Sequence, residues 1–502
     1  MSLSRVLIGF AGLVFPVMTI AYSARPQVDL CHLTDARLPG RVAFSNSTEY
    51  QDAQGSYYTA QEREVIPNCV FRPTSTADVA CFVMLAVAND PCRNCSLSRP
   101  LFAVRGGGHT LWQGAANANG SVTIDMRGMN SFSLSADNEI ASIGGGSNFA
   151  DIYPQLVPHN LTVLGGRIPG VAAGGFLSGG GKNFLSRRHG FGCDNIHGYE
   201  VVLANGDVIY ASASENEDLW LALKGGSNNF GIITRYDLAT YPLYLMWGGT
   251  TLLDYNSEVL EAEAQAFSDF MLPENLDDAA DLTVLLGFVN VSFFIENTLY
   301  YSDAVPDPPV FANFTSLPGI TTRNLELATV AEHVDLAGSI VPLTIPRSFE
   351  LVYAFHNADG ATYAELIQTW QDGISSIDDI EGLQILFLTQ PMPVTNGTNS
   401  LGLPVHDTDL AMTVLTAAWD NVADDDTVGN ALQSIVDLHE DILKKTGLSI
   451  PFKYLNYADV TQNPISTYGE ENIAHLWATS KKYDPNGLWQ TRVPGCKLPQ
   501  TS

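Results

Sequence analysis

The sequence predicts an α+β fold made of two successive domains, and three observations lead to this prediction. The chain has 502 residues, which is enough for two or three globular domains. Glycine-rich loops and short apolar strands are concentrated between residues 64 and 242. After residue 245 the glycine clusters stop, and longer strand patterns alternate with helical ones, as in a sheet backed by helices.

The first 23 residues have the features of a secretory signal peptide. Arg5 supplies a positive charge, an apolar core of about 15 residues follows, and small residues offer cleavage near Ser23 or Ala24. The core is short for a membrane span and Pro16 interrupts it, which leaves a retained anchor as the weaker alternative. We therefore expect a secreted protein that does not associate with a membrane.

Two further patterns favour the secretory pathway. The chain carries seven Asn-X-Ser/Thr sequences and seven cysteines, five of them in an N-terminal block. We expect disulfides in that block with their pairing left open, and Cys193 as an unpaired thiol because the count is odd. The glycosylation sequences begin at Asn46, Asn94, Asn119, Asn160, Asn290, Asn313 and Asn396. The five cysteines are Cys31, Cys69, Cys81, Cys92 and Cys95.

Local patterns predict the helices and loops of the first domain. Residues 25–62 are polar and predict loops. Ser75 stands three residues before Asp78, a capping-box spacing, and the apolar run that follows predicts a helix. Ser214 and Glu217 predict the cap of a second helix in the same way.

Apolar runs bounded by turn residues predict strands in both domains. In the first domain they cover 101–109, 121–126, 139–146, 231–243 and a hairpin at 199–212 that turns at Asn205-Gly206. In the second domain strands are predicted at 283–295, 351–355, 383–389 and 410–419, and helices at 257–271 and 426–447.

Charge and residue spacing exclude two classes of partner. The formal net charge is −29, with 54 acidic against 25 basic residues, and such a field repels nucleic acid. Apart from Cys92 and Cys95, no paired Cys/His spacing typical of a metal site occurs, so no metal is predicted. His189 and His197 fall in loops of the first domain, and His406 falls in a predicted surface turn.

The glycine clusters between residues 106 and 231 predict a ligand with phosphates. Backbone N–H groups in such turns bind anions, and no side chain blocks the approach. Residues 176–183 resemble a P-loop, but Phe176 replaces its first glycine and Asn183 replaces the Ser/Thr that holds magnesium. A G-x-G-x-x-G fingerprint is also absent from the sequence, so neither a P-loop NTPase nor a Rossmann domain is supported.

Instead, a series of separate glycine loops carries a resemblance to a known family. In order they read RGGGHT, IGGGSN, LGGR, GVAAGGFLSGGGKNFLSRRHGFGCDN and ALKGGSNNFG, with PNCVFRPTSTADV before them and YLNYAD and KKYDPNGLW after them. Together they resemble the berberine-bridge-enzyme-like oxidoreductases of the vanillyl-alcohol-oxidase (PCMH-type) superfamily. The resemblance implies an FAD-binding domain of two α/β subdomains at 64–242, a substrate domain with an antiparallel sheet at 245–445, and a C-terminal segment at 446–502 that returns to the flavin domain.

The resemblance also implies covalently bound FAD. RGGGH taken alone also fits a tight loop beside a structural histidine, but in the family this histidine is bonded to the dimethylbenzene edge of the flavin. His109 is then the attachment residue, and Gly106 stands where relatives commonly have Ser. Many relatives have a second, cysteinyl bond at the position of Ile168, so the resemblance implies a single bond here. The implied cofactor-binding residues are Arg105, Gly106, Gly107, Gly108, His109, Thr110, Gly165, Gly166, Gly170, Gly174, Gly175, Asn195 and Asn456.

The implied chemistry is hydride transfer to the flavin, for which the protein supplies a base. We read YLNYAD as a strand in which Tyr457 is the candidate base and Asn456 a flavin contact, against the alternative of a packing tyrosine. A phenol ordinarily has a pKa of ~10, so it must be activated to work near neutrality. Val171 resembles its counterpart in oxygen-permitting relatives, and molecular oxygen is the expected electron acceptor.

The resulting prediction is a secreted, monomeric FAD-dependent oxidase of a hydrophobic small molecule in fungal secondary metabolism. We expect residues 290–295, 351–355 and 383–388 to wall an enclosed, apolar pocket with few carboxylates or amides. One alternative is an oligosaccharide oxidase. Another is a binding or cyclising protein that keeps its flavin without net redox turnover.

Overall fold

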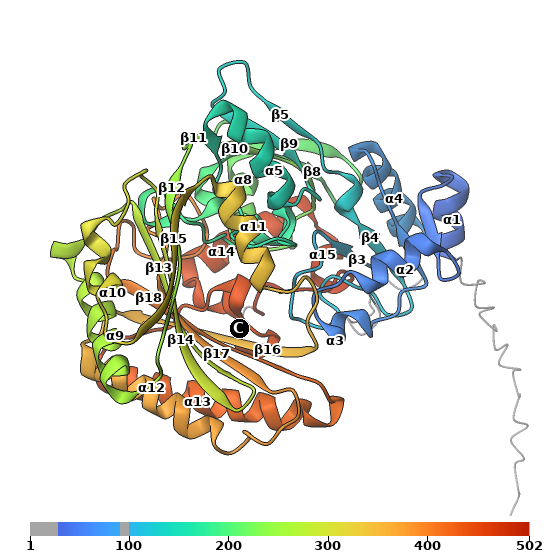
Figure 1. Ribbon diagram of the computed structural model, residues 1–502. Helices are drawn as coiled ribbons and strands as arrows, with labels where there is room; N and C mark the ends of the chain where they lie inside the picture. The colour runs from blue at the N-terminus through green and yellow to red at the C-terminus, as the bar shows by residue number, and fades with distance from the viewer. Residues whose placement is uncertain (1–28, 91–99, 501–502) are drawn as a thin grey trace, which may run out of the picture.

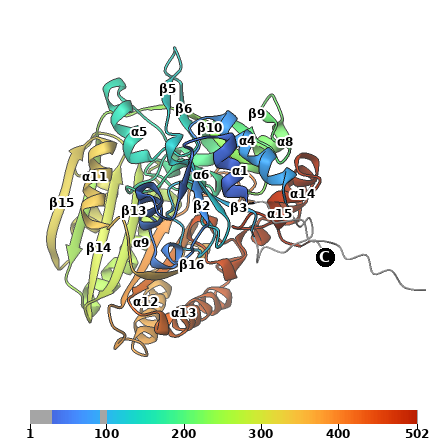
Figure 2. The ribbon, with the colours of Figure 1, turned by 90° about the vertical axis from the view of Figure 1, so that its right-hand side faces the viewer.

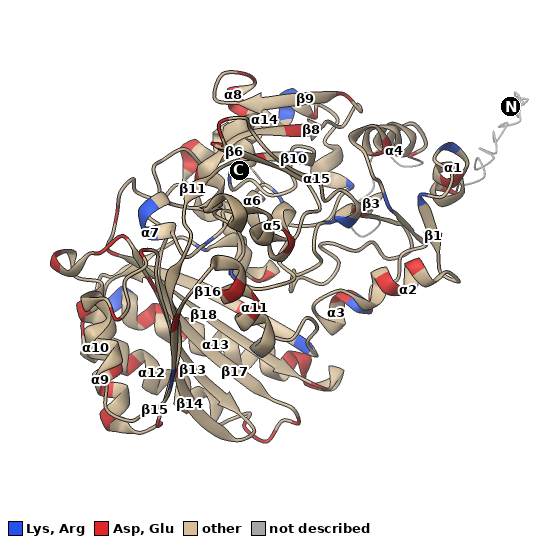
Figure 3. Ribbon diagram, turned by 45° about the horizontal axis from the view of Figure 1, so that its top comes forward, with Lys and Arg blue, Asp and Glu red and all other residues tan. Residues whose placement is uncertain are grey.

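The computed structural model describes residues 29–90 and 100–500 (Figure 1). The predicted signal peptide, Cys92, Cys95 and the sequon at Asn94 lie outside these residues. The described chain is a mixture of helices and sheets, and its largest sheet is antiparallel, so the predicted α+β class is confirmed. Acidic positions are spread over the whole ribbon, and the fewer basic ones are scattered among them (Figure 3).

The first half of the chain forms two small sheets. The first has the order β1-β2-β4-β3, in which β4 pairs in parallel with both β2 and β3. Its strands are β1 (Val42–Phe44), β2 (Cys69–Phe71), β3 (Phe102–Arg105) and β4 (Val122–Asp125). The second has the antiparallel order β5-β6-β10-β8-β9. Its strands are β5 (Phe132–Leu134), β6 (Ile140–Gly144), β8 (Ile196–Val202), β9 (Val208–Ser212) and β10 (Ile232–Ala239). The pair β7 (Leu161–Thr162) and β11 (Tyr241–Pro242) lies beside them.

Short capped helices surround these sheets. The Ser75 hydroxyl accepts a hydrogen bond from the Asp78 N–H, as the sequence predicts, and α4 begins at Thr76. The helices of this half are α1 (Leu30–Arg37), α2 (Thr48–Gly55), α3 (Ala60–Arg63), α4 (Thr76–Ala88), α5 (Phe149–Leu156), α6 (Ala173–Ser178), α7 (Ser186–His189) and α8 (Glu217–Leu223).

The second half forms one antiparallel sheet of eight strands, in the order β15-β12-β14-β13-β17-β18-β16-β19. Its strands are β12 (Met246–Leu253), β13 (Ala280–Val289), β14 (Ser292–Tyr301), β15 (Ile320–Ala328), β16 (Arg347–His356), β17 (Gln384–Pro391), β18 (Leu410–Trp419) and β19 (Ser449–Ile450). Helices α9 (Ser257–Phe270), α12 (Gly360–Ile374) and α13 (Asp425–Lys445) cover its outer face, whereas α11 (Val330–Ile340) lies on the side of the first half (Figures 1 and 2). The chain continues through α10 (Ala312–Thr315), α14 (Glu470–Tyr483) and α15 (Leu488–Thr491).

Strand alternation divides the side chains of this sheet between two environments. On β13, Val284 and Leu286 are buried in the cluster that packs against α9, α12 and α13. Thr283 precedes Val284, and Leu285 lies between Val284 and Leu286. Both therefore face the opposite side of the sheet. Because every strand repeats this pattern, the sheet seals a hydrophobic core on one side and presents a second surface toward the first half of the chain.

Two predictions of secondary structure in the first half were wrong. Residues 25–62 are not only loops, because α1, α2 and α3 form there, each started by an Asp, Ser or Thr side chain that accepts a backbone N–H. Ser214 does not cap α8: its N–H donates to the Ser212 hydroxyl in the preceding turn, and Asn216 is the N-cap residue.

The predicted strand at 283–295 is also wrong, because it is two strands. The chain reverses between β13 and β14 at Asn290 and Val291, which both have positive φ. This is the backbone of a tight hairpin turn, usually marked by Asn-Gly. Val291 replaces the expected glycine, so the turn carries no clear sequence signal.

The N-terminal cysteine block contains one disulfide within the described residues. Cys31 at the start of α1 is bonded to Cys69 at the start of β2. Cys81, Cys193 and Cys496 are free, and Cys193 is fully buried, in agreement with its predicted unpaired state.

A buried carboxyl in the second half predicts a pH dependence of stability. Glu263 on α9 is 1% exposed, its Oε2 accepts from Asn297 Nδ2 at 2.9 Å, and burial raises its pKa to about 7. A carboxyl whose folded-state pKa is raised stabilises fully below its unfolded pKa of ~4.3, and this stabilisation is lost as the pH rises through about 7.

The parent protein should therefore lose about 3 kcal/mol of unfolding free energy between pH 4.5 and pH 8, because the buried Glu263 must ionise. We expect Glu263→Gln to lack this loss. The measurement is the difference in free energy of urea unfolding between the variant and the parent at the two pH values. Glu261→Gln, on the exposed face of the same helix, is the control. An unchanged pH dependence in Glu263→Gln would contradict the assignment.

Candidate active site

A cavity of about 630 Å³ lies where the two halves of the chain meet. Its walls are the glycine loops of the first half, the inner surface of the large sheet, helix α11 with the loop after it, and the C-terminal segment around residues 454–458. The C-terminal segment contacts the first half here, because Asn456 Nδ2 donates to the Phe176 carbonyl at 2.9 Å.

Three glycine segments meet backbone to backbone at one part of the cavity. A Cβ atom on Gly107 would come within 2.5 Å of the Gly170 carbonyl oxygen, and one on Gly106 would lie 3.6 Å from Gly174 Cα. A Cβ on Gly175 would meet no atom within 4 Å. The loops approach closely because they lack side chains, and they leave a bare backbone surface that a dinucleotide can reach.

His109 follows the first of these glycine segments directly. Its ring lies parallel to that of Tyr58, with ring centroids 3.9 Å apart and an interplanar angle of 15°. Burial lowers the pKa of His109 to about 4. The imidazole is therefore neutral at physiological pH, and one ring nitrogen keeps a free lone pair.

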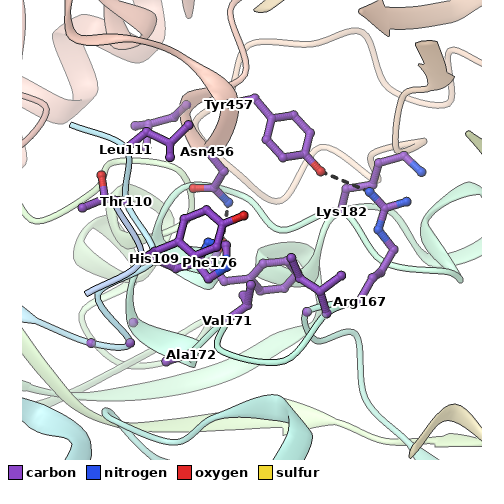
Figure 4. A pocket seen from close by; sticks show the side chains of 18 of the residues that line it. His109, Thr110, Leu111, Arg167, Val171, Ala172, Phe176, Lys182, Asn456 and Tyr457 are labelled. Atoms are coloured by element: carbon purple, nitrogen blue, oxygen red, sulfur yellow. Dashed lines mark hydrogen bonds between the residues drawn. The ribbon is translucent and has the colours of Figure 1, made fainter. Parts of the chain in front are cut away.

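The phenol of Tyr457 meets a network of buried charges on another side of the cavity (Figure 4). Arg167 Nη2 donates to the Tyr457 oxygen at 3.1 Å, and Arg167 Nη1 lies 3.3 Å from Asp281 Oδ2. Lys182 Nζ contacts the other oxygen of Asp281 at 2.5 Å. Burial lowers the pKa of Lys182 to about 8, although the Asp281 carboxylate opposes this shift. Two cations thus share one carboxylate, and one of them, Arg167, also donates from Nη2 to Tyr457 and to Gln390.

The segment that carries Tyr457 is not the predicted strand. Residues Leu455–Tyr457 form a single 3₁₀ turn, η7, closed by the Tyr457 N–H donating to the Tyr454 carbonyl at 3.0 Å. The Tyr454 hydroxyl accepts from Gly181 N at 2.8 Å, and Trp112 donates its indole N–H to the Ala458 carbonyl. These bonds fix the turn on both sides and direct Tyr457 into the cavity.

Most of the predicted site residues line the cavity, and four do not. The Arg105 side chain stacks on Tyr57 and donates to the Ala53 and Ser56 carbonyls, so it supports the glycine loop from behind. Asn195 donates to the His189 and Phe191 carbonyls instead of a ligand. Gly165 packs on Phe149, and Gly170 packs on His109. The predicted residues that line the cavity are Gly106, Gly107, Gly108, His109, Thr110, Gly166, Gly174, Gly175, Asn456 and Tyr457.

The inner surface of the large sheet corrects the expectation of an apolar wall. Four aromatic residues of the predicted wall pack in the cluster under the outer helices: Phe293, Tyr353, Phe355 and Phe387. The cavity side carries Leu285, Leu386, Leu388 and Val414 together with Thr250, Thr283, Thr298, Thr416, Gln390, Glu296 and Glu350. Burial raises the pKa of both carboxyls, to about 8 for Glu350. The predicted alternation of the strands is present, but the cavity side carries two carboxyls and an amide where the sequence predicted few such groups.

Several residues of this site were missed by sequence reasoning. Asp281 carried a usable signal, because a lone charge in a run of buried strand residues needs a buried partner. The partners of Asp281 are Arg167 and Lys182. Because these two residues come from separate loops, the sequence does not show that they meet Asp281. Tyr58 lies in a segment read as loop and gave no signal.

The other candidates from the sequence lie outside the cavity. His189 stacks on Tyr241 at 3.9 Å, and His197 and His406 are exposed. Among residues 29–90 and 100–500, no cluster of three His, Cys, Asp or Glu side chains could hold a metal ion. Within the same residues, no helix combines the length and the apolarity needed to cross a membrane.

The fold and the glycine-lined cavity define an FAD-linked oxidoreductase, and comparisons with known proteins agree. A family profile described as FAD binding domain matches residues 67–212. The FAD-dependent monooxygenase tpcD of Cochliobolus heterostrophus is 31% identical over 493 residues, covering 93% of each chain. The chain therefore belongs to the berberine-bridge-enzyme-like family of FAD-linked oxidoreductases.

More distant comparisons support the same fold. The bifunctional solanapyrone synthase of Alternaria solani is 29% identical, covering 93% of this chain and 88% of that one. A berberine-bridge-like protein of Physcomitrella patens has a TM-score of 0.76 at 22% identity, covering 94% of this chain and 100% of its own. A glucooligosaccharide oxidase of Acremonium strictum has a TM-score of 0.76 at 18% identity, covering 95% and 100%.

Proposed function

We propose that this protein is a secreted FAD-dependent oxidase of a largely hydrophobic small molecule, with its FAD bonded through His109 alone. The observation that carries the proposal is the joint placement of His109, the bare glycine backbone and the Tyr457–Arg167 pair around one cavity. Ile168 lines the same cavity at the position of the second tether in relatives, and its side chain forms no thioether.

The residues present fit FAD. The open space before Gly175 and the close backbone packing at Gly106 and Gly107 leave room for a pyrophosphate held by N–H groups. Arg167 and Lys182 are both paired with Asp281, so the backbone is the main source of positive potential for the phosphates. Bound FAD would supply a two-electron acceptor for a substrate hydride.

In this proposal Tyr457 is the base that accepts the proton of the substrate hydroxyl or amine. The Arg167 guanidinium donates to the Tyr457 oxygen at 3.1 Å and holds that oxygen in place at the cavity. The substrate loses one proton to Tyr457 and one hydride, and molecular oxygen takes up the two electrons to give hydrogen peroxide. Asn456 and Trp112 keep the turn in place during this step.

The cavity surface supports a hydrophobic substrate with a few polar groups. Leu386, Leu388 and Val414 on the sheet face Val341 and Ile345 from the loop after α11 across the cavity space. Relatives named as monooxygenases and as a solanapyrone synthase support a role in fungal secondary metabolism. The threonine and carboxyl groups on the same sheet surface favour the second candidate, an oligosaccharide oxidase, because sugar hydroxyls need such partners.

A peroxide-release screen of apolar alcohols, phenols and oligosaccharides tests this function. We expect peroxide with one or more apolar alcohols and anaerobic bleaching of the flavin by the same compound. Oxidation of oligosaccharides alone would support the second candidate. Label from ¹⁸O₂ in the product would show monooxygenation, and a flavin that no substrate class bleaches would leave the flavin as a structural group.

Surface features support passage through the secretory pathway. The six sequon asparagines within the described residues are all exposed. A disulfide joins Cys31 and Cys69. Expression in a eukaryotic secretory host should give protein in the medium whose mass falls after N-glycan removal, and retention inside the cell without glycans would contradict the proposed localisation.

A further inference from the structure

The ring stacked on His109 belongs to Tyr58, a residue of the N-terminal segment, 51 positions before it. The two rings are nearly parallel, and their centroids lie 3.9 Å apart. Both side chains line the cavity. A stacked neighbour restricts rotation of an imidazole because turning the ring out of the stack loses contact over its whole face.

Tyr58 is itself held in place by its backbone. Its N–H donates to the Gly108 carbonyl at 2.9 Å, directly beside His109 in the chain. Its carbonyl accepts from the Ile345 N–H at 2.7 Å and from Arg63 Nη1 at 2.9 Å. The stack therefore joins the N-terminal segment, the glycine loop and the loop after α11.

Gly170 leaves room for the same imidazole on another side. Its φ is +88°, and a Cβ atom there would come within 3.3 Å of His109 Cδ2. The bare backbone at Gly170 accommodates the His109 ring, and the stack on Tyr58 restricts its rotation. A ring held in this way keeps one orientation before any bond is made.

The hydroxyl of Tyr58 has no chemical part in this arrangement. Burial, with a smaller contribution from Glu350, raises the pKa of Tyr58 to about 12, so the phenol stays protonated. Within the described residues it makes no hydrogen bond to His109. The contribution of Tyr58 is the face of its ring.

We propose that Tyr58 is a positioning residue for flavin attachment: by stacking on His109 it fixes the imidazole in the orientation from which the nitrogen bonds to the flavin. This inference rests on the His109 tether proposed above. In that reaction an imidazole N–H bond and a C–H bond of the flavin 8α-methyl group are replaced by one N–C bond. The two hydrogens and two electrons reduce the same flavin, and molecular oxygen reoxidises it with release of hydrogen peroxide.

The experiment compares Tyr58→Ala and Tyr58→Phe with the parent protein. The readout is the fraction of flavin that stays with the polypeptide after acid precipitation, sampled at successive times after FAD is added to flavin-free protein and measured by absorbance and by mass, with total flavin measured before precipitation. We expect Tyr58→Phe to match the parent, because it keeps the stacked ring. Tyr58→Ala should attach flavin roughly three- to tenfold more slowly while still binding it reversibly through the intact glycine loops.

Two further arms separate the possible failures. Tyr58→Leu keeps a sizeable apolar side chain without the aromatic face, and slow attachment in this variant supports stacking even if Tyr58→Ala fails to fold. Attachment at the parental rate in a folded Tyr58→Ala or Tyr58→Leu would overturn the proposal and leave the tether intact. A parent protein that releases all its flavin on precipitation would overturn the tether itself, and the role of Tyr58 with it.

Discussion

Replacing Tyr457 with phenylalanine should lower turnover about 100-fold or more, because the variant has no oxygen to accept the substrate proton. The ring stays, so the 3₁₀ turn and the contact of Asn456 with Phe176 should remain. Flavin content should therefore equal that of the parent. The measurement is kcat with the best substrate from the peroxide screen, together with the flavin-to-protein ratio.

Tyr244→Phe is the matched control, because Tyr244 is 57% exposed and lies outside the cavity. It should leave both kcat and flavin content unchanged. Turnover of Tyr457→Phe within a few-fold of the parent would return Tyr457 to a packing role, and the base would then have to be sought among the other cavity groups.

Asp281→Asn should reduce the free energy of unfolding by about 3–5 kcal/mol, as expected when one partner of a buried ion pair is removed. Asp281 and Lys182 are each 1% exposed, and Asp281 is the shared carboxylate of Lys182 and Arg167. Lys182 can lose its proton when its partner is gone, because its pKa is already lowered to about 8. The guanidinium of Arg167 cannot, so most of the cost falls there.

The measurement is urea unfolding at neutral pH. Asp278→Asn is the control, since Asp278 is 55% exposed and pairs with Arg188 at the surface, where ion pairs contribute about 0–1 kcal/mol. Equal unfolding midpoints for Asp281→Asn and the parent would show that the Arg167–Asp281–Lys182 network does not stabilise the fold. It would also remove the argument that this network fixes Arg167 beside Tyr457.

The order of glycine motifs was enough to predict the fold class and the glycine-lined part of the cavity. Glycine is informative where a side chain cannot fit: a Cβ at Gly107 would collide with the Gly170 carbonyl, so that position tolerates little else. The direction of a side chain is less constrained by its sequence neighbours. Arg105 adjoins the glycine loop but turns away from the cavity to the Ala53 and Ser56 carbonyls, and the sequence gives no sign of this.

The partners in the charge network and the direction of the side chains on the sheet were also not predictable from neighbouring residues in the sequence. Arg167, Lys182 and Asp281 come together only through tertiary folding, because 99 residues separate the lysine from the aspartate. On the sheet, alternation predicted two faces but not which face met the helices. Phe293 and Phe387 face the outer helices, where Trp370 of α12 packs against both of them.

The central claim is a single covalent bond between FAD and His109, and peptide mapping of the denatured protein tests it most directly. The account predicts that the proteolytic peptide containing His109 carries the mass of FAD, that no cysteine-containing peptide does, and that His109→Ala keeps some FAD but releases it on denaturation. Quantitative release of flavin from the parent protein, with an unmodified His109 peptide, would contradict the account.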